Sequence, residues 1–368
     1  MSRTGVIANY TIASLITIAA LEIGSGIAWN YLQSAQVNEG GVLAVQRMLN
    51  ETPGSSATLV SNPYSLYWNN PAFKDAEYGE QYDSFGYRSS TELLDIPHDA
   101  FRILVLGGST TNMWPFVKDK QKIWTARVEE FLNQQFDRRI AVLNAGLPYG
   151  TTAELMVHFL TIGKYLKPDL IIYHGGGNDS MPLMFPGYRT DYSHARWSTA
   201  GSKVREPFRS LLAWSDFFKL TGSVVFGGGV HNGEPFGFAR LDREKTLGRV
   251  SETFPLAFRE NLEVIIGEAN RLGAKVHLVG FLQARRENLS RNRPDMAGLE
   301  DSMILAVEKH DAIMLDLADK YQSVNFTKLD GDRFSDEWFQ DNCHLTEDGE
   351  AEKAAQVVQA LIASEYFD

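Results

Sequence analysis

Three short segments of this sequence carry side chains that could together act on a carbonyl group. A serine ends the segment Gly107–Ser109, a histidine follows an aspartate by three positions in Asp341–His344, and an asparagine follows three glycines at Asn178. A serine hydroxyl can attack a carbonyl carbon when a histidine takes its proton and a carboxylate orients that histidine. A carboxamide can donate a hydrogen bond to the oxyanion that forms. The candidates for such chemistry are therefore Ser109, His344, Asp341 and Asn178.

Each segment taken alone also has an ordinary structural explanation. A Gly-Gly-Ser turn after a strand can cap the next helix, an isolated Asp-x-x-His can be a surface contact, and Gly-Asn-Asp is common turn chemistry. The same holds for the glycine-containing segment Asn144–Thr152. The Gly-x-Ser-x-Gly elbow of α/β-hydrolases is absent, because Thr111 stands where the final glycine would be. The functional interpretation depends on the combination of segments.

The elements around these segments indicate one sheet that could bring them together. From residue 101, short β-rich runs alternate with amphipathic stretches, which predicts an α/β three-layer sandwich with a mostly parallel central sheet flanked by helices. We expect strands at Arg102–Leu106, Ile140–Leu143, Leu170–Tyr173, Val276–Val279 and Ala312–Leu315. We expect helices at 121–136, 151–166, 254–272, 295–310 and 346–363. In such a sheet, ligands bind at the carboxyl ends of the strands. The segments with Ser109, Asn144–Thr152 and Asn178 each follow a predicted strand.

In this order, the segments resemble the four sequence blocks of the SGNH hydrolases, the superfamily of GDSL-like lipases and esterases. The matching segments are Gly107–Ser109, Asn144–Thr152, Gly176–Asp179 and Asp341–Thr346, and the resemblance covers about residues 100–363. It implies an SGNH or flavodoxin-like fold. It also implies Ser109 as nucleophile, His344 as general base and then acid, and Asp341 as the carboxylate that orients His344.

The resemblance further implies an oxyanion hole made of the Ser109 N–H, the Gly150 N–H and the Asn178 side-chain amide. The chain departs from the family pattern in two places. Gly-Asp-Ser is Gly-Gly-Ser here, which changes no reacting group, and the glycine block is one residue longer than usual. The backbone donor could therefore belong to Tyr149 or to Gly150.

A segment upstream of the first strand carries a second resemblance. Asp83–Arg88 resembles the N-x-x-G-[FY]-R segment that precedes the first block in membrane-anchored bacterial members, with Asp83 in place of the asparagine. We interpret Gly86 as a turn residue and Arg88 as a packing or ion-pair residue.

The N-terminal region predicts a transmembrane anchor. Thr4–Leu21 contains 18 residues without a formal charge, enough for a helix of ~27 Å against a hydrocarbon thickness of ~30 Å. Arg3 is the one positive charge before this stretch and Arg47 is the next after it, which places the catalytic domain outside the cytoplasm, periplasmic or extracellular. A signal peptide cleaved near Gly26–Ala28, giving a secreted protein, and a buried helix of the globular domain remain alternatives.

The chain accordingly divides into an anchor at 4–32, a connector at 33–100 packed on the main domain, and a hydrolase domain at 101–366. We expect 33–75 to be loop-like. An aromatic-rich insertion at about 180–250 interrupts the α/β alternation, and its aromatic side chains could contact substrate or pack locally: Tyr188, Tyr192, Trp197, Phe226 and Phe236.

Composition excludes several classes of function. The formal net charge of −11 offers no basic surface for nucleic acid. The one cysteine, Cys343, excludes an internal disulfide and a zinc site with two thiolates, and we interpret it as a small space-filling residue. No His/Asp/Glu cluster has metal-ligand spacing, because His158 and His174 are isolated, and the chemistry requires no cofactor.

The sequence therefore predicts a serine esterase that hydrolyses O-acyl esters of carbohydrates or lipids. Two alternatives are an O-acetyltransferase acting on a cell-surface polysaccharide and a non-catalytic envelope-assembly module on the same scaffold. The acyl and alcohol specificity and the oligomeric state stay open at this level.

Overall fold

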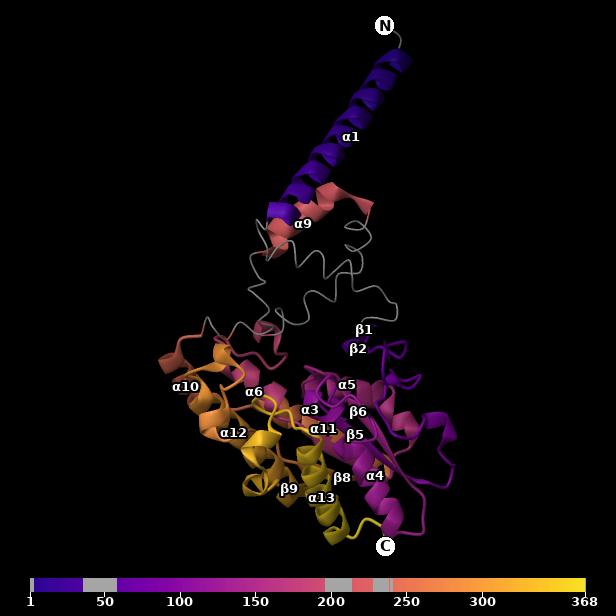
Figure 1. The fold of residues 1–368 in the computed structure, drawn as a ribbon, viewed down its shortest axis with the longest axis vertical. Coiled ribbons are helices and arrows are strands. Elements are labelled where there is room, and N and C mark those ends of the chain that lie inside the picture. The colour runs from indigo at the N-terminus through magenta and orange to yellow at the C-terminus, as the bar shows by residue number, and fades with distance from the viewer. Residues whose placement is uncertain (1–2, 36–57, 196–213, 228–237, 239–240, 368) are drawn as a thin grey trace. The chain divides into compact units, whose positions relative to one another are not determined.

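The structure is a computed structural model that describes residues 3–35, 58–195, 214–227, 238 and 241–367 (Figure 1). The chain divides into two compact units. Unit 1 comprises Met1–Pro53 and Ser198–Gly237, and unit 2 comprises Gly54–Trp197 and Phe238–Asp368. The candidates for acyl chemistry all belong to unit 2.

Unit 2 is built on a parallel sheet of five strands in the order β6-β5-β7-β8-β9. The central strands β5 and β7 are almost entirely buried, as the apolar runs predict for a sheet covered on both faces. The predicted fold class is therefore confirmed. The strands span β5 Phe101–Gly107, β6 Ile140–Gly146, β7 Leu170–His174, β8 Lys275–Val279 and β9 Val324–Thr327.

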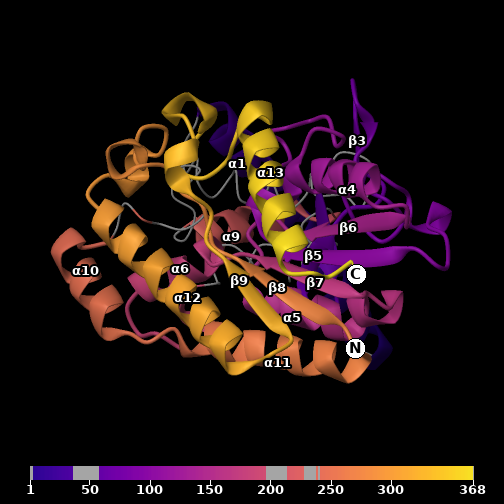
Figure 2. The same ribbon diagram turned by 90° about the horizontal axis from the view of Figure 1, so that it is seen from below.

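Helices cover both faces of this sheet, which gives three layers (Figure 2). One apolar core lies between the sheet and α5 (Thr152–Thr161), α11 (Leu256–Leu272) and α12 (Glu300–Lys320). A second core lies on the other face, against α4 (Trp124–Gln135) and α13 (Glu347–Ala363). Short 3-10 helices connect these elements at Leu93–Asp95, Gly163–Leu166, Arg286–Asn288, Pro294–Met296, Gly331–Arg333 and Asp336–Trp338.

The fifth strand differs from the prediction. Ala312–Leu315 was expected to be a strand, but it belongs to α12, and the strand is β9 at Val324–Thr327. The short apolar run is part of a longer helical pattern, because buried residues of α12 follow the i, i+3, i+4, i+7 spacing of one helix face: Met303, Ala306, Val307, His310, Ile313, Met314 and Leu317. A run of four apolar residues cannot by itself distinguish a strand from a segment of buried helix.

The segment before the sheet is more ordered than the expected loop. It contains two antiparallel hairpins, β1 (Leu59–Asn62) with β2 (Leu66–Asn69), and β3 (Lys74–Asp75) with β4 (Gly79–Glu80). Tyr67, Trp68 and Tyr87 lie in the main apolar core, so this segment packs as part of unit 2. Gly86 has φ +79°, as expected for a turn.

The region predicted as an insertion contributes to both units. Helices α6 (Gly177–Met184) and α10 (Arg243–Glu252) belong to unit 2, whereas α9 (Asp216–Gly227) belongs to unit 1. Trp197 and Phe236 lie outside the described residues, and of Phe226 only the helical backbone is described.

Unit 1 contains α1 (Arg3–Ala35) and α9. Within α1, Ala13–Leu32 is long and apolar enough to cross a membrane, and only 11% of its best window is buried. The structure thus contains one apolar N-terminal helix of membrane-spanning length among the described residues, as the sequence predicts.

Candidate active site

Three adjacent strands, β5, β6 and β7, end at the same level. The segments Gly107–Ser109, Asn144–Thr152 and Gly176–Asp179 lie at these strand ends. Gly107 at the end of β5 pairs with Gly146 of β6 on one side and with His174 of β7 on the other. The chain then leaves the sheet toward Ser109, toward the 147–151 turn and toward Asn178 at the start of α6. The parallel register therefore assembles these segments at one edge.

Ser109 opens a very short helix, α3 (Ser109–Asn112), directly after β5. As the first residue of this helix, Ser109 has an N–H group with no acceptor inside the helix. The preceding Gly108 lies close to the Asn178 side chain, since a Cβ there would lie 2.8 Å from Asn178 Nδ2. Gly108 thus allows the Asn178 amide to approach the nucleophile turn.

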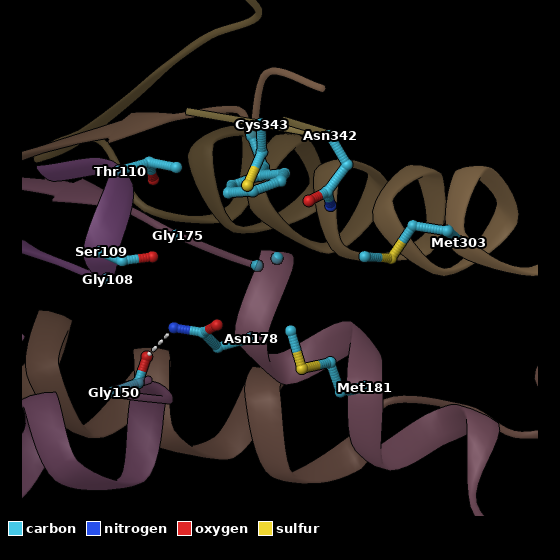
Figure 3. Close-up of a pocket in the computed structure, with 13 residues that line it drawn as sticks. Gly108, Ser109, Thr110, Gly150, Gly175, Asn178, Met181, Met303, Asn342 and Cys343 are labelled. Carbon is cyan, nitrogen blue, oxygen red and sulfur yellow. Dashed lines mark hydrogen bonds between the residues drawn. The ribbon is translucent and has the colours of Figure 1, made fainter. Parts of the chain in front are cut away.

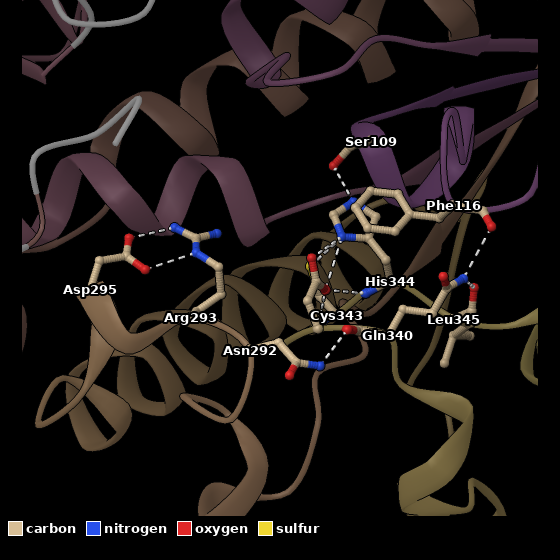
Figure 4. A network of polar contacts seen from close by, with 10 residues as sticks. Ser109, Phe116, Asn292, Arg293, Asp295, Gln340, Cys343, His344 and Leu345 are labelled. Atoms are coloured by element: carbon tan, nitrogen blue, oxygen red, sulfur yellow. Dashed lines mark hydrogen bonds and ion pairs between the residues drawn. The ribbon is translucent and has the colours of Figure 1, made fainter. Parts of the chain in front are cut away.

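Ser109, His344 and Asp341 form a continuous hydrogen-bonded chain (Figure 4). His344 Nε2 lies 2.8 Å from Ser109 Oγ, and His344 Nδ1 lies 2.8 Å from Asp341 Oδ2. A carboxylate at Nδ1 favours the tautomer with the proton on that nitrogen, so Nε2 accepts from the serine hydroxyl. Ser109 is thus in contact with His344, which follows it by 235 positions in the sequence.

The local backbone holds the Asp341 carboxylate in place. The N–H groups of Cys343 and His344 both donate to Asp341 Oδ1, at 2.9 and 2.8 Å. Burial acts to raise the pKa of Asp341, but the hydrogen bonds and charge of His344 together with these N–H groups hold it below its ordinary value. Asp341 is therefore present as a carboxylate near neutral pH.

The imidazole of His344 is also fixed from its face. The Phe116 ring stacks on it with centroids 3.7 Å apart and planes 8° apart (Figure 4). The strand bridge between Phe339 and Leu345 closes the loop that carries His344. Thr346 directly precedes α13, and its side chain forms no capping hydrogen bond.

Asn178 lies across the pocket from Ser109 and donates to the Gly150 carbonyl at 2.9 Å (Figure 3). A carboxamide nitrogen carries two hydrogens, so a second donor remains on Asn178. The Gly150 N–H donates to Leu147 O at 2.9 Å, inside the 147–150 turn. The amide predicted as a third oxyanion donor is therefore already used by the turn, and Gly150 contributes its carbonyl to Asn178. The neighbouring Tyr149 adopts a left-handed backbone, with φ +61°.

A pocket opens beside Ser109 (Figure 3). One side consists of glycine backbone from the strand ends, which lets a ligand approach the main chain closely. Three larger apolar side chains, Met181, Phe281 and Met303, contribute to its wall. The remaining lining residues are Gly108, Ser109, Thr110, Gly150, Gly175, Gly176, Gly177, Asn178, Asn342 and Cys343.

Asp179, which follows Asn178, forms buried hydrogen bonds that the sequence did not reveal. Its buried carboxylate accepts from Thr152 Oγ1 at 2.6 Å, from Thr152 N at 3.0 Å and from Tyr192 Oη at 3.0 Å. Burial raises the pKa of Asp179 to about 6, against these hydrogen bonds. Tyr192, considered above as a substrate contact, is 1% exposed and instead binds Asp179.

The carbonyl groups of α3 are bound by side chains from distant parts of unit 2. A helix of four residues leaves most of its carbonyls without helical partners. Thr110 O accepts from Lys353 Nζ at 2.9 Å and from Trp124 Nε1 at 3.3 Å, and Thr111 O accepts from Asn144 Nδ2 at 2.8 Å. Lys353 is 2% exposed, and its burial lowers its pKa to about 8 although the nearby Glu350 acts to raise it.

Arg88 binds the end of the same helix. It is fully buried and donates to Asn112 O and Val117 O, both at 2.7 Å, and to Lys118 O at 2.8 Å. Burial lowers its pKa to about 10, which still leaves it charged at neutral pH. The residue interpreted from the sequence as a packing or ion-pair group therefore binds mainly backbone carbonyls that follow Ser109 in the chain.

The other two histidines named from the sequence lie in the interior. His158 is stacked on Trp68, with centroids 3.6 Å apart, and lies 2.8 Å from Tyr87 Oη. His174 Nδ1 lies 2.8 Å from Thr111 Oγ1. His174 therefore contacts α3, and His158 packs against Trp68 and Tyr87 of the main apolar core.

Among the described residues, one cluster has metal-ligand chemistry, and it lies in the loop that carries Asp341 and His344. Asp341, Cys343 and His344 have ligand atoms within 4.8 Å of one another. Burial, followed by the charge of Asp341, raises the pKa of the Cys343 thiol well above its ordinary value, so it is a protonated thiol. Both ring nitrogens of His344 are engaged by Asp341 and Ser109. The donor set thus fits a hydrogen-bonded triad better than a metal site.

No protein-family model matches the chain, and no curated protein matches it. The solved structures that resemble it include GDSL-like lipases, acylhydrolases and acetyl xylan esterases. A lipase/acylhydrolase from Enterococcus faecalis is 15% identical, with a TM-score of 0.40 over 71% of this chain and 95% of that chain. A GDSL-like lipase from Bacteroides thetaiotaomicron is 12% identical, with a TM-score of 0.36 over 72% and 89%. An acetylxylan esterase from Geobacillus stearothermophilus is 13% identical, with a TM-score of 0.40 over 70% and 92%.

Proposed function

We propose that this protein is a serine hydrolase of the SGNH type that cleaves carboxylic O-acyl esters. The observation that carries the proposal is the hydrogen-bonded chain from Ser109 through His344 to Asp341, located beside a pocket at the carboxyl edge of the sheet. A serine hydroxyl is a weak nucleophile at neutral pH, and a histidine at hydrogen-bonding distance removes that limitation.

In the proposed mechanism, Ser109 Oγ attacks the ester carbonyl carbon while its proton passes to His344 Nε2. The carboxylate of Asp341 stabilises the imidazolium that forms, and His344 then donates the proton to the leaving alcohol. A water molecule repeats the sequence on the acyl-enzyme, with His344 again as base, and releases the carboxylic acid. Asp341 remains ionised throughout.

The tetrahedral oxyanion would be bound by two donors in this proposal. The Ser109 N–H is available at the start of α3, and the Asn178 amide has a hydrogen that is not used by Gly150. Each such donor lowers the barrier because it is already oriented where negative charge develops.

We further propose that α1 anchors the protein in a membrane, with the hydrolase unit outside the cytoplasm. The support is the exposed apolar helix of spanning length and the charge asymmetry around it. Ester groups on carbohydrates or lipids are the proposed substrates. The matches to acetyl xylan esterases and lipases come from both substrate classes and do not distinguish them.

The test is covalent labelling of the purified protein with a fluorophosphonate probe, followed by mass spectrometry of the modified peptide. We expect modification at Ser109, hydrolysis of p-nitrophenyl acetate or butyrate, and loss of both in Ser109→Ala. The single variants Ser109→Ala and His344→Ala should each lose at least ~10⁴-fold in kcat, and the double variant should lose no more, because the two residues act as one unit. A folded wild-type protein that neither reacts nor hydrolyses these esters would contradict the proposal and favour a non-catalytic role.

A further inference from the structure

The single charged residue in the apolar part of α1 has a specific partner. Glu22 is the one charged residue between Thr4 and Leu32, and a carboxylate without partners is costly in or near the hydrocarbon of a membrane. In unit 1, its Oε2 accepts from the Ser215 hydroxyl at 2.6 Å and its Oε1 accepts from the Asp216 N–H. The start of α9 therefore supplies hydrogen-bond donors to Glu22, the one charged side chain that disfavours α1 as a membrane anchor.

Small residues allow α9 to lie close to α1 at this point. Gly26 follows Glu22 by one helical turn, and a Cβ on it would lie 2.8 Å from Asp216 Oδ2. Ser25 and Trp29 continue the same side of α1 and are buried, as is Ser223 on α9. Small residues at such a contact are typical of helices that pair in membranes, since they let two backbones approach each other.

The outer faces of both helices are apolar and exposed. On α1, large apolar side chains from Leu15 to Ile27 are 51% to 69% exposed. At α9, Trp214 is 92% exposed, and Val224, Phe217 and Phe218 are also exposed. A helix of the length of α9 measures ~18 Å, which is too short to cross the ~30 Å hydrocarbon layer. Trp214, which lies just before α9, is of a residue type that is enriched where lipid meets water.

We propose that α9 is a second membrane-associated element, which pairs with an uncleaved α1 and lies at the lipid–water boundary. In this arrangement, the spanning segment is Thr4–Leu21 rather than Ala13–Leu32, because Ala13–Leu32 would place Glu22 near the centre of the hydrocarbon. Glu22 then lies at the edge of the hydrocarbon, and the outer face of α9 contacts the lipid bilayer. The inference rests on the anchoring part of the proposed function and not on the esterase chemistry. Cleavage near Gly26–Ala28 would remove Glu22 from its partners, so the pairing assigns α1 to the mature protein.

The pairing is tested by a disulfide between α1 and α9. A Cβ built on Gly26 lies 3.8 Å from the Cβ of Asp216, the separation typical of a disulfide. We would make Gly26→Cys with Asp216→Cys in the full-length chain, with Cys343→Ser so that no other cysteine is present. Gly24→Cys with Asp216→Cys is the matched control, because a Cβ on Gly24 meets nothing within 4 Å.

After oxidation of isolated membranes, we expect mass spectrometry to find the 26–216 linked peptide and little or no 24–216 link. Equal linking of both pairs, or no 26–216 link in a chain that retains its N-terminal peptide, would overturn the pairing. A mature chain that lacks residues 1–28 would overturn the uncleaved anchor. Fluorophosphonate labelling of the wild-type protein is independent of all these outcomes, so failure of the pairing and failure of the hydrolase proposal are distinguishable.

The lipid contact is tested by spin labels at Phe217→Cys and Phe218→Cys, each in the Cys343→Ser background. The protein is placed in vesicles of phosphatidylethanolamine and phosphatidylglycerol, and the collision rates of each label with oxygen and with a water-soluble nickel complex are compared. We expect oxygen to dominate at both positions and nickel to dominate at Tyr165→Cys, a control position in unit 2 where the native side chain is 72% exposed. Nickel dominance at 217 and 218 would overturn the membrane contact.

Discussion

The Lys353 ammonium group donates a hydrogen bond to the Thr110 carbonyl at 2.9 Å, one residue after the proposed nucleophile. This contact joins α13 to a helix that is too short to bind its own carbonyl groups. The Trp124 ring lies 4.9 Å from the same ammonium nitrogen, and Glu350 Oε2 accepts from the backbone N–H of Trp124 at 2.8 Å. A buried cation therefore fixes the backbone that carries Ser109.

Replacing Lys353 by methionine should lower the rate of reaction at Ser109 without removing any group that touches substrate. Methionine keeps the length of the side chain but leaves the Thr110 carbonyl with the longer Trp124 contact alone. A small displacement of a nucleophile can cost up to ~10²-fold in rate, so we expect Lys353→Met to reduce kcat by about 10- to 100-fold with KM nearly unchanged. The measurement is the kinetics of p-nitrophenyl ester hydrolysis together with the rate of fluorophosphonate labelling.

The control for this prediction is Lys122→Met. Lys122 forms an exposed ion pair with Glu347 at 2.8 Å, next to the start of α13, and exposed pairs contribute little to stability. Its loss should leave kcat within about twofold of the wild type. Equal effects of the two substitutions would argue against a specific role for the Lys353 contact.

Gly108→Ala should disable Asn178 by steric contact. The new methyl group would lie 2.8 Å from Asn178 Nδ2, which must then move away from the oxyanion position. Loss of one oxyanion donor typically costs ~10²- to 10³-fold in kcat, and we expect this range for Asn178→Ala and a similar loss for Gly108→Ala. The double variant should be no slower than Asn178→Ala in steady-state assays.

Gly248→Ala is the matched control, since a Cβ at this position in α10 meets nothing within 4 Å. It should retain full activity and should slightly stabilise the helix. Additive losses in the Gly108→Ala, Asn178→Ala double variant would show that Gly108 acts on something other than the amide.

Tyr192→Phe should affect stability rather than substrate binding. The Tyr192 hydroxyl donates to the buried Asp179 carboxylate at 3.0 Å, and loss of one hydrogen bond to a buried group costs about 1–3 kcal/mol. We expect the free energy of unfolding in urea to fall by about this amount, while KM for each ester in a panel of acyl lengths and alcohols stays the same. An increase in KM for one class of ester would show instead that Tyr192 contacts substrate.

Acid should destabilise unit 2 through its buried histidines. Burial lowers the pKa of His158 to about 3, whereas the unfolded chain titrates this group near its ordinary value of ~6.5. As the pH falls below ~6.5, the unfolded state therefore binds a proton that the folded state excludes, and stability decreases by up to ~1.4 kcal/mol per pH unit until the folded group titrates.

The measurement is urea unfolding at several pH values between 4 and 7 for the wild type and for His158→Gln. We expect the variant to have a shallower loss of stability with acid, because it cannot bind the proton in the unfolded state. His98→Gln, which changes an exposed histidine, should leave the slope as it is in the wild type. Unchanged slopes in both variants would contradict the assignment to His158.

Much of the catalytic unit could be predicted from the sequence because its signals are local. Apolar runs with helical stretches between them specify a parallel sheet, and four of five strands were located in this way. Ser109, Asn178 and the Asp341–His344 segment stand at strand or helix boundaries that the same runs define. The strand predicted at Ala312–Leu315 was wrong, because an apolar run of that length has no period of its own. Only the packing of the longer helix α12 determines that this segment is helical.

Other features depended on contacts between distant parts of the chain, which only the tertiary structure decides. Lys353 and Arg88 look like ordinary charged residues in the sequence. They are buried because they bind carbonyl groups of α3 that have no partner within the helix. The 147–150 turn likewise determines that the Gly150 N–H donates to the Leu147 carbonyl. Packing between distant segments determines that the Phe116 ring covers His344. The residue types thus specified the chemistry, whereas the non-local packing of backbone and side chains specified how each reacting group is held.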